Sequence, residues 1–177
     1  MKSFGFACLF FLGFALLESA VLPNILILPA VPDFILLCSL YFSLNNGRLF
    51  GACSGFASGL FLDFFCAAPF GYNCLLRTIF GYVAGLFSKT LNINGMFFPF
   101  ILGAFSTLFK AFVLWLIAVF YPNVNVSYSI FSISFGFELL LNSVLAPFVF
   151  KFLNIFINSA RAILNTPIFT PSQSIIL

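Results

Sequence analysis

Two rows of residues with a four-residue spacing constrain this chain more than any other feature. The rows are Gly51, Gly55, Gly59 and Asp63, and then Asn73, Arg77, Gly81 and Gly85. At 3.6 residues per turn, residues four apart lie along one face of a helix. Glycine faces let two backbones approach closely, and close packing holds helices together in lipid. The rows therefore predict a hairpin of two helices, over residues 49–66 and 70–87, packed through Gly51, Gly55, Gly59, Gly81 and Gly85.

The chain is too apolar to form a soluble domain. Of its 177 residues, 63% are hydrophobic and 6% are charged, whereas soluble domains carry about 25% charged residues. Apolar runs of about 20 residues, the length that crosses a bilayer, alternate with short polar turns. The sequence predicts an all-α integral membrane protein with six transmembrane helices. They are placed at residues 4–22, 25–44, 49–66, 70–87, 96–121 and 130–157, in a single membrane domain over 1–160 with a cytoplasmic tail over 161–177.

Prolines break the first half of the second span. Pro29 and Pro32 each remove a backbone donor and bias the preceding residue away from helix, so residues 25–30 are expected to be bent. Regular helix is expected from about Asp33 to Leu44. Asp33 then falls in the first turn, where free N–H groups and the helix dipole stabilise a carboxylate.

Basic residues predict the orientation of the spans. With the N-terminus inside, the basic residues outside the spans or near their ends all lie on the cytoplasmic side: Lys2, Arg48, Lys89, Lys151 and Arg161. The outer turns carry no lysine or arginine, as the positive-inside rule requires. Both termini are therefore predicted to be cytoplasmic. Residues 1–20 also resemble a signal peptide, but their end departs from the cleavage pattern, and an even number of spans argues for retention.

Six ionisable residues remain within the spans: Glu18, Asp33, Asp63, Arg77, Lys110 and Glu138. A bare charge in hydrocarbon is costly, so these residues are expected to pair. Depths counted at about 1.5 Å per residue bring Asp63 near Arg77 and make Lys110 nearly level with Glu138, which predicts two ion pairs. Two interpretations stay open: the pairs fix the register of the helices, or they line a polar cavity in the outer half.

The sequence offers no arrangement typical of an enzyme or a metal protein. It has no histidine, no close cysteine pair, and no GxSxG, P-loop or HExxH motif. Ser106 and Lys110 share a helix face, but nothing activates the serine. Cys66 and Cys74 could form a disulfide, although buried thiols suit their apolar surroundings better. We expect no catalysis, no cofactor or metal, and no nucleic-acid partner, since few basic residues face the cytoplasm.

An ordered series of motifs runs from residue 31 to residue 88. It comprises Pro32-Asp33, Tyr41, Gly47-Arg48-x-x-Gly51, Gly55-Phe56-x-x-Gly59-Leu60-x-x-Asp63, Pro69-x-Gly71-x-Asn73-x-x-x-Arg77 and Gly81-Tyr82-x-x-Gly85. This series resembles the MreD family, the rod shape-determining proteins of bacteria. The last two spans carry no matching motif and agree with the family in topology only.

The resemblance implies a non-enzymatic scaffold subunit of the bacterial cell-elongation machinery, which makes peptidoglycan and sets rod shape. Such a protein is multi-pass in the inner (cytoplasmic) membrane, in contact with membrane lipid. The implied partners are an MreC-like bitopic protein, a RodA-like polymerase, its transpeptidase and the MreB filament. Carried onto this chain, the family's pattern makes Asp33, Asp63, Asn73 and Arg77 a polar core that fixes the outer face for MreC. Lys110 and Glu138 join that core only through their own predicted pairing.

A second class of function suits the same architecture. Substrate-binding subunits of energy-coupling-factor vitamin transporters are also small six-span proteins with short loops. An outward cavity lined by Glu18, Asp33 and Glu138 would suit a small polar ligand, although the short outer loops leave little to cover it. Neighbouring genes discriminate the two: MreC-like and RodA-like frames favour the scaffold, and an ATPase pair favours the transporter.

Overall fold

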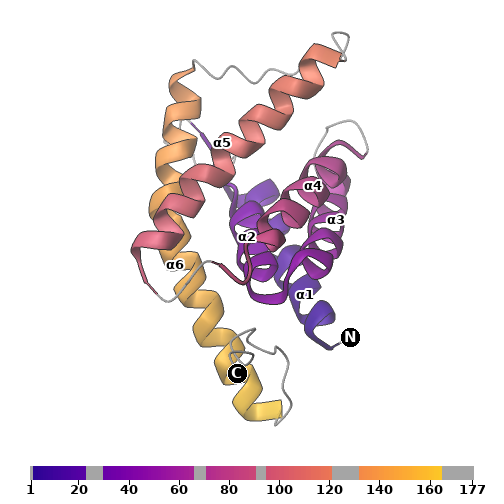
Figure 1. Ribbon diagram of the computed structural model, residues 1–177, viewed down its shortest axis with the longest axis vertical. Helices are drawn as coiled ribbons and strands as arrows, with labels where there is room; N and C mark the ends of the chain where they lie inside the picture. The colour runs from indigo at the N-terminus through magenta and orange to yellow at the C-terminus, as the bar shows by residue number, and fades with distance from the viewer. Residues whose placement is uncertain (1, 23–29, 66–70, 91–94, 121–131, 165–177) are drawn as a thin grey trace.

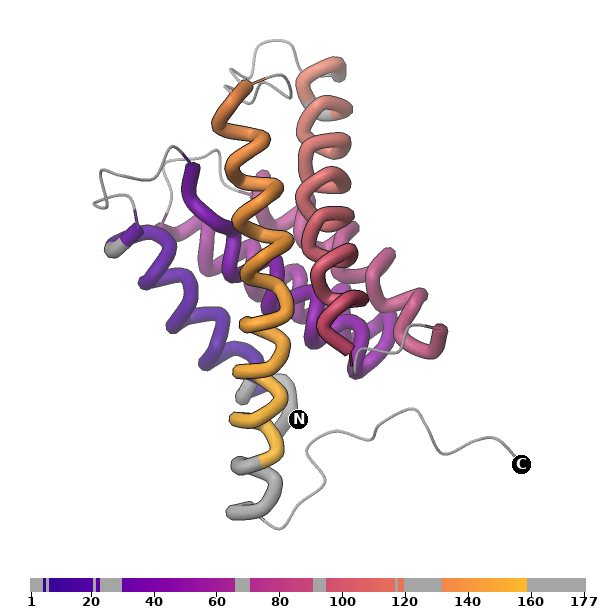
Figure 2. The backbone as a smooth tube through the Cα atoms, turned by 90° about the vertical axis from the view of Figure 1, so that its left-hand side faces the viewer, coloured from indigo at the N-terminus to yellow at the C-terminus, as the bar shows by residue number. Residues whose placement is uncertain are grey.

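The regular elements of the protein are helical throughout the part that the structure describes. The computed structural model describes residues 2–22, 30–65, 71–90, 95–120 and 132–164. The helices are α1 (Lys2–Leu16), continued by the π-helical turn η1 (Leu17–Val21), α2 (Phe34–Asn46), α3 (Arg48–Phe65), α4 (Tyr72–Leu86), α5 (Phe97–Phe120) and α6 (Ile133–Leu164). Figure 1 shows the start of α1 and the end of α6 toward the same end of the molecule, and Figure 2 shows the same bundle turned by 90°. The prediction of an all-α fold is confirmed for these residues.

The helix bounds follow the predicted spans closely, with one extension. Asp33 caps α2, so regular helix begins where Pro32 predicts it. The bent stretch expected over residues 25–30 lies outside the described residues except for Ala30. The helix α6 continues to Leu164, whereas the sixth span was predicted to end near Ile157. Residues 158–164 contain neither proline nor glycine, so nothing in the sequence stops the helix there.

The outer surface is apolar on most of the helices. Within the described residues, two helices are long and apolar enough to cross a membrane, Phe97–Leu116 with 20 residues and Ile133–Asn158 with 26 residues. Two shorter apolar helices are Ala7–Ala20 and Phe34–Asn46. Large hydrophobic side chains lie exposed even well inside the helices, such as Phe105 at 54% and Phe148 at 59%. Soluble proteins rarely expose so much contiguous apolar surface, and a lipid environment explains it.

The helices α3 and α4 form a hairpin in which the two backbones touch. A methyl group added at Gly51 would overlap the Gly81 carbonyl, and one at Gly55 would overlap the Arg77 carbonyl. A methyl group at Gly85 would lie 2.5 Å from the Cα atom of Arg48, closer than real atoms approach. The structure thus brings the two glycine rows together along the whole length of the hairpin. The hydroxyl groups of Ser54 and Ser58 on α3 donate within the helix, to the carbonyls of Gly51 and Gly55.

The helix α2 occupies the centre of the bundle. Ten consecutive residues, Ile35 to Leu44, are buried, because α2 contacts α1, α3, α4 and α6. The remaining pair, α5 and α6, crosses at Gly103, where an added methyl group would lie 2.7 Å from the Ala146 side chain. Figure 1 shows α5 and α6 separating toward the end of α5. The start of α2 therefore lies where the hairpin, α5 and α6 all converge.

Candidate functional site

Asp33 begins the site, held in place by the first turn of α2. Its Oδ1 atom accepts a hydrogen bond of 2.8 Å from the backbone N–H of Leu36, as an N-cap residue does. Its own N–H donates to Oδ1 of Asn142 on α6 at 2.9 Å. The side chain is 3% exposed. A carboxylate buried to this degree requires positive partners.

Two cations from different helices meet this carboxylate. Arg77 of α4 donates from Nη2 to Oδ1 of Asp33 at 2.6 Å, and Lys110 of α5 donates from Nζ to Oδ2 at 3.0 Å. The Arg77 side chain is almost fully buried, whereas that of Lys110 is 20% exposed. Asp33 therefore ties the hairpin to α5 through one carboxyl group.

The site extends from Lys110 to α6. Nζ of Lys110 also donates to Oε1 of Glu138 at 2.7 Å, so the structure brings this predicted pair together. Nearby, Nδ2 of Asn142 donates to Oγ1 of Thr107 at 3.0 Å. We call the set Asp33, Arg77, Thr107, Lys110, Glu138 and Asn142 the polar network. Its two carboxylates face two cations, so its formal charges balance within the bundle.

Asp63 lies outside this network, and the predicted Asp63–Arg77 pair is wrong. The carboxylate of Asp63 instead accepts from the backbone N–H groups of Gly71, Asn73 and Cys74 at 3.0–3.2 Å, and from Nδ2 of Asn73 at 2.9 Å. Those groups form the start of α4, where the free N–H groups and the dipole favour an anion. The carboxylate of Asp63 is thus stabilised by the N-terminus of α4. Arg77 pairs instead with Asp33, the residue that caps α2.

Glu18 lies at the edge of the network on the π-helical turn η1. Its Oε2 atom accepts from the backbone N–H of Ile35 at 3.4 Å, a long hydrogen bond. A π-helical turn often marks a functional position, because it shifts side chains out of the regular helical register. Here it presents a third carboxylate to the start of α2.

Two residues of the α5–α6 contact, Gly103 and Thr107, were missed by the sequence analysis. Gly103, Thr107 and Lys110 recur at spacings of four and three, which places them on one face of α5. Gly103 lets the α6 backbone approach, so Thr107 reaches Asn142. This spacing could have indicated the face of α5 that contacts α6, but a single glycine is weaker evidence for helix packing than a row of three.

The site has the chemistry of a structural network. Oγ of Ser106 donates to the Gly103 carbonyl at 2.7 Å, and Nζ of Lys110 is shared by two carboxylates, so no serine–lysine dyad forms. Cys74 is a buried free thiol, and Cys66 lies outside the described residues. Among the residues that can be described, no group of three or more His, Cys, Asp or Glu could hold a metal ion.

A helical bundle with an apolar exterior and internally paired charges defines a membrane-associated helical protein. The family model described as "rod shape-determining protein MreD" matches residues 2–156. The chain therefore belongs to the MreD family of rod shape-determining proteins. The match includes α5 and most of α6, where no motif indicated the family. Comparisons with curated proteins and with solved structures give no match.

Proposed function

We propose that the protein is a multi-pass subunit of the bacterial inner membrane that serves as a non-enzymatic scaffold for cell elongation. The observation that carries this proposal is the family match over residues 2–156, since the family is one of shape-determining structural proteins. A scaffold needs a rigid shape and no reactive group. The glycine-packed hairpin and the charge-balanced network suit that requirement.

The proposed topology has six spans with both termini in the cytoplasm. The helix α3 has 18 residues and is about 27 Å long, close to the roughly 30 Å of a bilayer core. The ends of α1 and α6 that would face the cytoplasm lie on the same side of the bundle (Figure 1). The basic residues Arg48, Lys89 and Lys151 would then share the cytoplasmic surface, in keeping with the positive-inside rule.

The proposed partner is an MreC-like protein with one span and a large periplasmic part. In this topology the start of α4 faces the periplasm, and Asp63 fixes that start by accepting four hydrogen bonds. The polar network holds the start of α2 against the same end of the bundle. Two rigid helix starts would give a partner span a defined surface.

The transporter alternative gains less support from the geometry. Asp33 and Glu138 are already paired with cations, so a ligand would have to displace Lys110 or Arg77. We therefore favour the scaffold.

In-cell photo-crosslinking tests the proposal with two matched positions on α4. Leu75 and Leu86 are both exposed, at 54% and 49%, and lie near opposite ends of the helix. A photo-reactive residue in place of Leu75 should capture a bitopic periplasmic protein, and the same residue at Leu86 should capture less of it. Depletion should round the cells. Equal capture at both positions, or rod-shaped cells after depletion together with a stoichiometric bound vitamin, would overturn the scaffold.

A further inference from the structure

A cavity at the other end of the bundle is separate from the polar network. It lies between the end of α2, the start of α5 and the middle of α6, and its volume is about 290 Å³. Ligand sites begin at about 300 Å³, so the cavity suits a small group rather than a large cofactor. Its lining residues are Tyr41, Asn45, Gly95, Met96, Pro99, Pro147, Phe150, Lys151 and Asn154.

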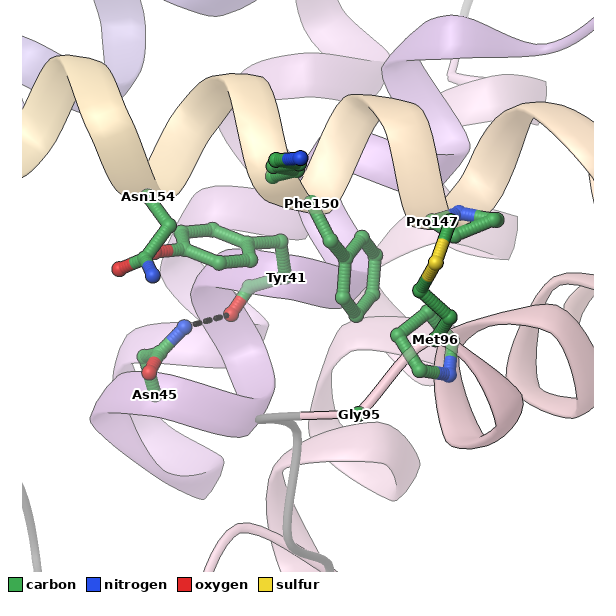
Figure 3. A pocket seen from close by; sticks show the side chains of 9 residues that line it. Tyr41, Asn45, Gly95, Met96, Pro147, Phe150 and Asn154 are labelled. Carbon is green, nitrogen blue, oxygen red and sulfur yellow. Dashed lines mark hydrogen bonds between the residues drawn. The ribbon is translucent and has the colours of Figure 1, made fainter.

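The polar groups of the cavity suit an anion. The described lining includes one cation, Lys151, two amides, Asn45 and Asn154, and no carboxylate. The Tyr41 hydroxyl meets Oδ1 of Asn154 at 3.5 Å, a contact long enough to be exchanged for a better acceptor. Figure 3 shows Asn154 beside the Tyr41 ring and the Asn45 amide bonded to the Tyr41 carbonyl, a bond of 2.9 Å.

The start of α5 adds positive potential to the same cavity. Gly95 and Met96 line it immediately before the helix begins at Phe97. The helix is 24 residues long, so its dipole and the first-turn N–H groups of Phe97 and Phe98 favour an anion nearby, whereas Pro99 has no N–H to offer. Lys151 and the N-terminus of α5 thus both favour an anion in the cavity.

Exposed apolar side chains flank the cavity. Met96 and Phe97 at the start of α5 are 66% and 71% exposed, and Phe148 and Phe152 on α6 are 59% and 53% exposed. A free phosphate ion would gain nothing from such a flank. An amphiphile would use both parts, with its headgroup in the cavity and its acyl chains along the phenylalanines.

We propose that this cavity binds the headgroup of an anionic phospholipid. The phosphate lies between the Lys151 ammonium and the Asn45 and Asn154 amides, and the acyl chains lie on the exposed faces of α5 and α6. In the proposed topology the cavity opens at the cytoplasmic surface, where such lipids are available. The inference rests on that membrane placement and not on the partner protein.

The test measures lipid retention by the full-length protein in mild detergent, using native mass spectrometry. Phosphatidylglycerol should be retained in preference to phosphatidylethanolamine. Lys151→Gln should weaken phosphatidylglycerol binding about fivefold, the contribution of one lysine at an anionic surface. Lys89→Gln is the matched control, because Lys89 is also exposed and does not line the cavity. It should leave retention unchanged.

A second variant keeps the charge and changes the cavity. Asn154→Leu should also lower phosphatidylglycerol retention, and it decides the question if Lys151→Gln does not fold. Equal retention of the two lipids, or equal losses in Lys151→Gln and Lys89→Gln, would overturn the proposal. Full competition by inorganic phosphate would assign the cavity to a free anion instead. A variant that no longer retains the lipid should still crosslink to the periplasmic partner. The crosslinking result therefore tests the scaffold proposal separately from the lipid proposal.

Discussion

The hairpin α3–α4 and the pair α5–α6 are held together in different ways. In the hairpin, glycines at 51, 55, 59, 81 and 85 bring the two backbones into contact along its length. In the pair, one such contact occurs at Gly103, and an ion pair and an amide bond supply the rest. Continuous backbone packing needs no charges along the seam, whereas a single crossing depends on polar side chains to fix its register.

The difference indicates that the hairpin α3–α4 is the more rigid part of the bundle and that the pair α5–α6 can separate more easily. Asp33 is the residue that joins the two parts, because Arg77 comes from the hairpin and Lys110 from the pair. If the account is right, substitutions in the hairpin should destabilise through sterics. Substitutions at Asp33 and its partners should loosen the connection between the two parts.

The largest expected effect is that of Arg77→Met. It removes one cation from the carboxylate of Asp33, whose side chain is 3% exposed, so the free energy of unfolding should fall by about 3–5 kcal/mol. Lys110 still faces Asp33, which favours the lower end of that range. Reversible unfolding in mixed micelles measures the change. A variant as stable as the parent would contradict the buried pair.

Gly55→Ala should have the next largest effect. The added methyl group meets the Arg77 carbonyl, a backbone atom that cannot rotate away, so we expect a loss of about 1–3 kcal/mol. Gly13→Ala on α1 is the matched control, because no atom lies within 4 Å of the added methyl group. The control should not be destabilised in the same unfolding assay. Similar losses for both variants would show that helix propensity, not hairpin packing, sets the result.

Asp63→Ala should have a more local effect. It removes the acceptor for three N–H groups at the start of α4, and loss of a helix cap costs about 0.5–2 kcal/mol. Hydrogen exchange should rise at the start of α4 and stay unchanged at its end. Uniform faster exchange along α4 would mean that Asp63 supports the whole hairpin and not its cap.

Gly103→Ala should have the smallest effect of the four. The nearest atoms are the Ala146 methyl group and the Asn142 carbonyl, both at 2.7 Å, and no other described glycine of α5 or α6 lies at such a contact. The two helices can separate slightly, so we expect a loss of about 1 kcal/mol or less. Gly136→Ala, with nothing within 4 Å, is its control. A loss larger than that of Gly55→Ala would reverse the comparison between the two regions.

Much of the fold could be predicted from local patterns. Hydrophobic run length and polar turns located α3, α4 and α5 within two residues, and Pro32 located the start of α2. The glycine rows indicated which faces of α3 and α4 meet, because a four-residue spacing fixes the face of a helix. Depth along the membrane also sufficed to pair Lys110 with Glu138, since their helices are neighbours.

The pairing of Asp33 with Arg77 could not be predicted in the same way. The depth of a residue gives its distance from the membrane surface, but it does not indicate which helix lies beside that residue. The start of α4 folds back onto the carboxylate of Asp63 and supplies its hydrogen-bond partners. The central position of α2 depends on packing between helices that are distant in sequence, which no local pattern encodes.

A double-mutant cycle tests the central claim most directly, by measuring the coupling of Arg77 to each candidate carboxylate. Unfolding free energies are compared for Arg77→Met, Asp33→Asn, Asp63→Asn and the two double variants. The account predicts a coupling of about 1–3 kcal/mol between Arg77 and Asp33, and a value within about 0.5 kcal/mol of zero between Arg77 and Asp63. Strong coupling to Asp63 together with none to Asp33 would contradict it.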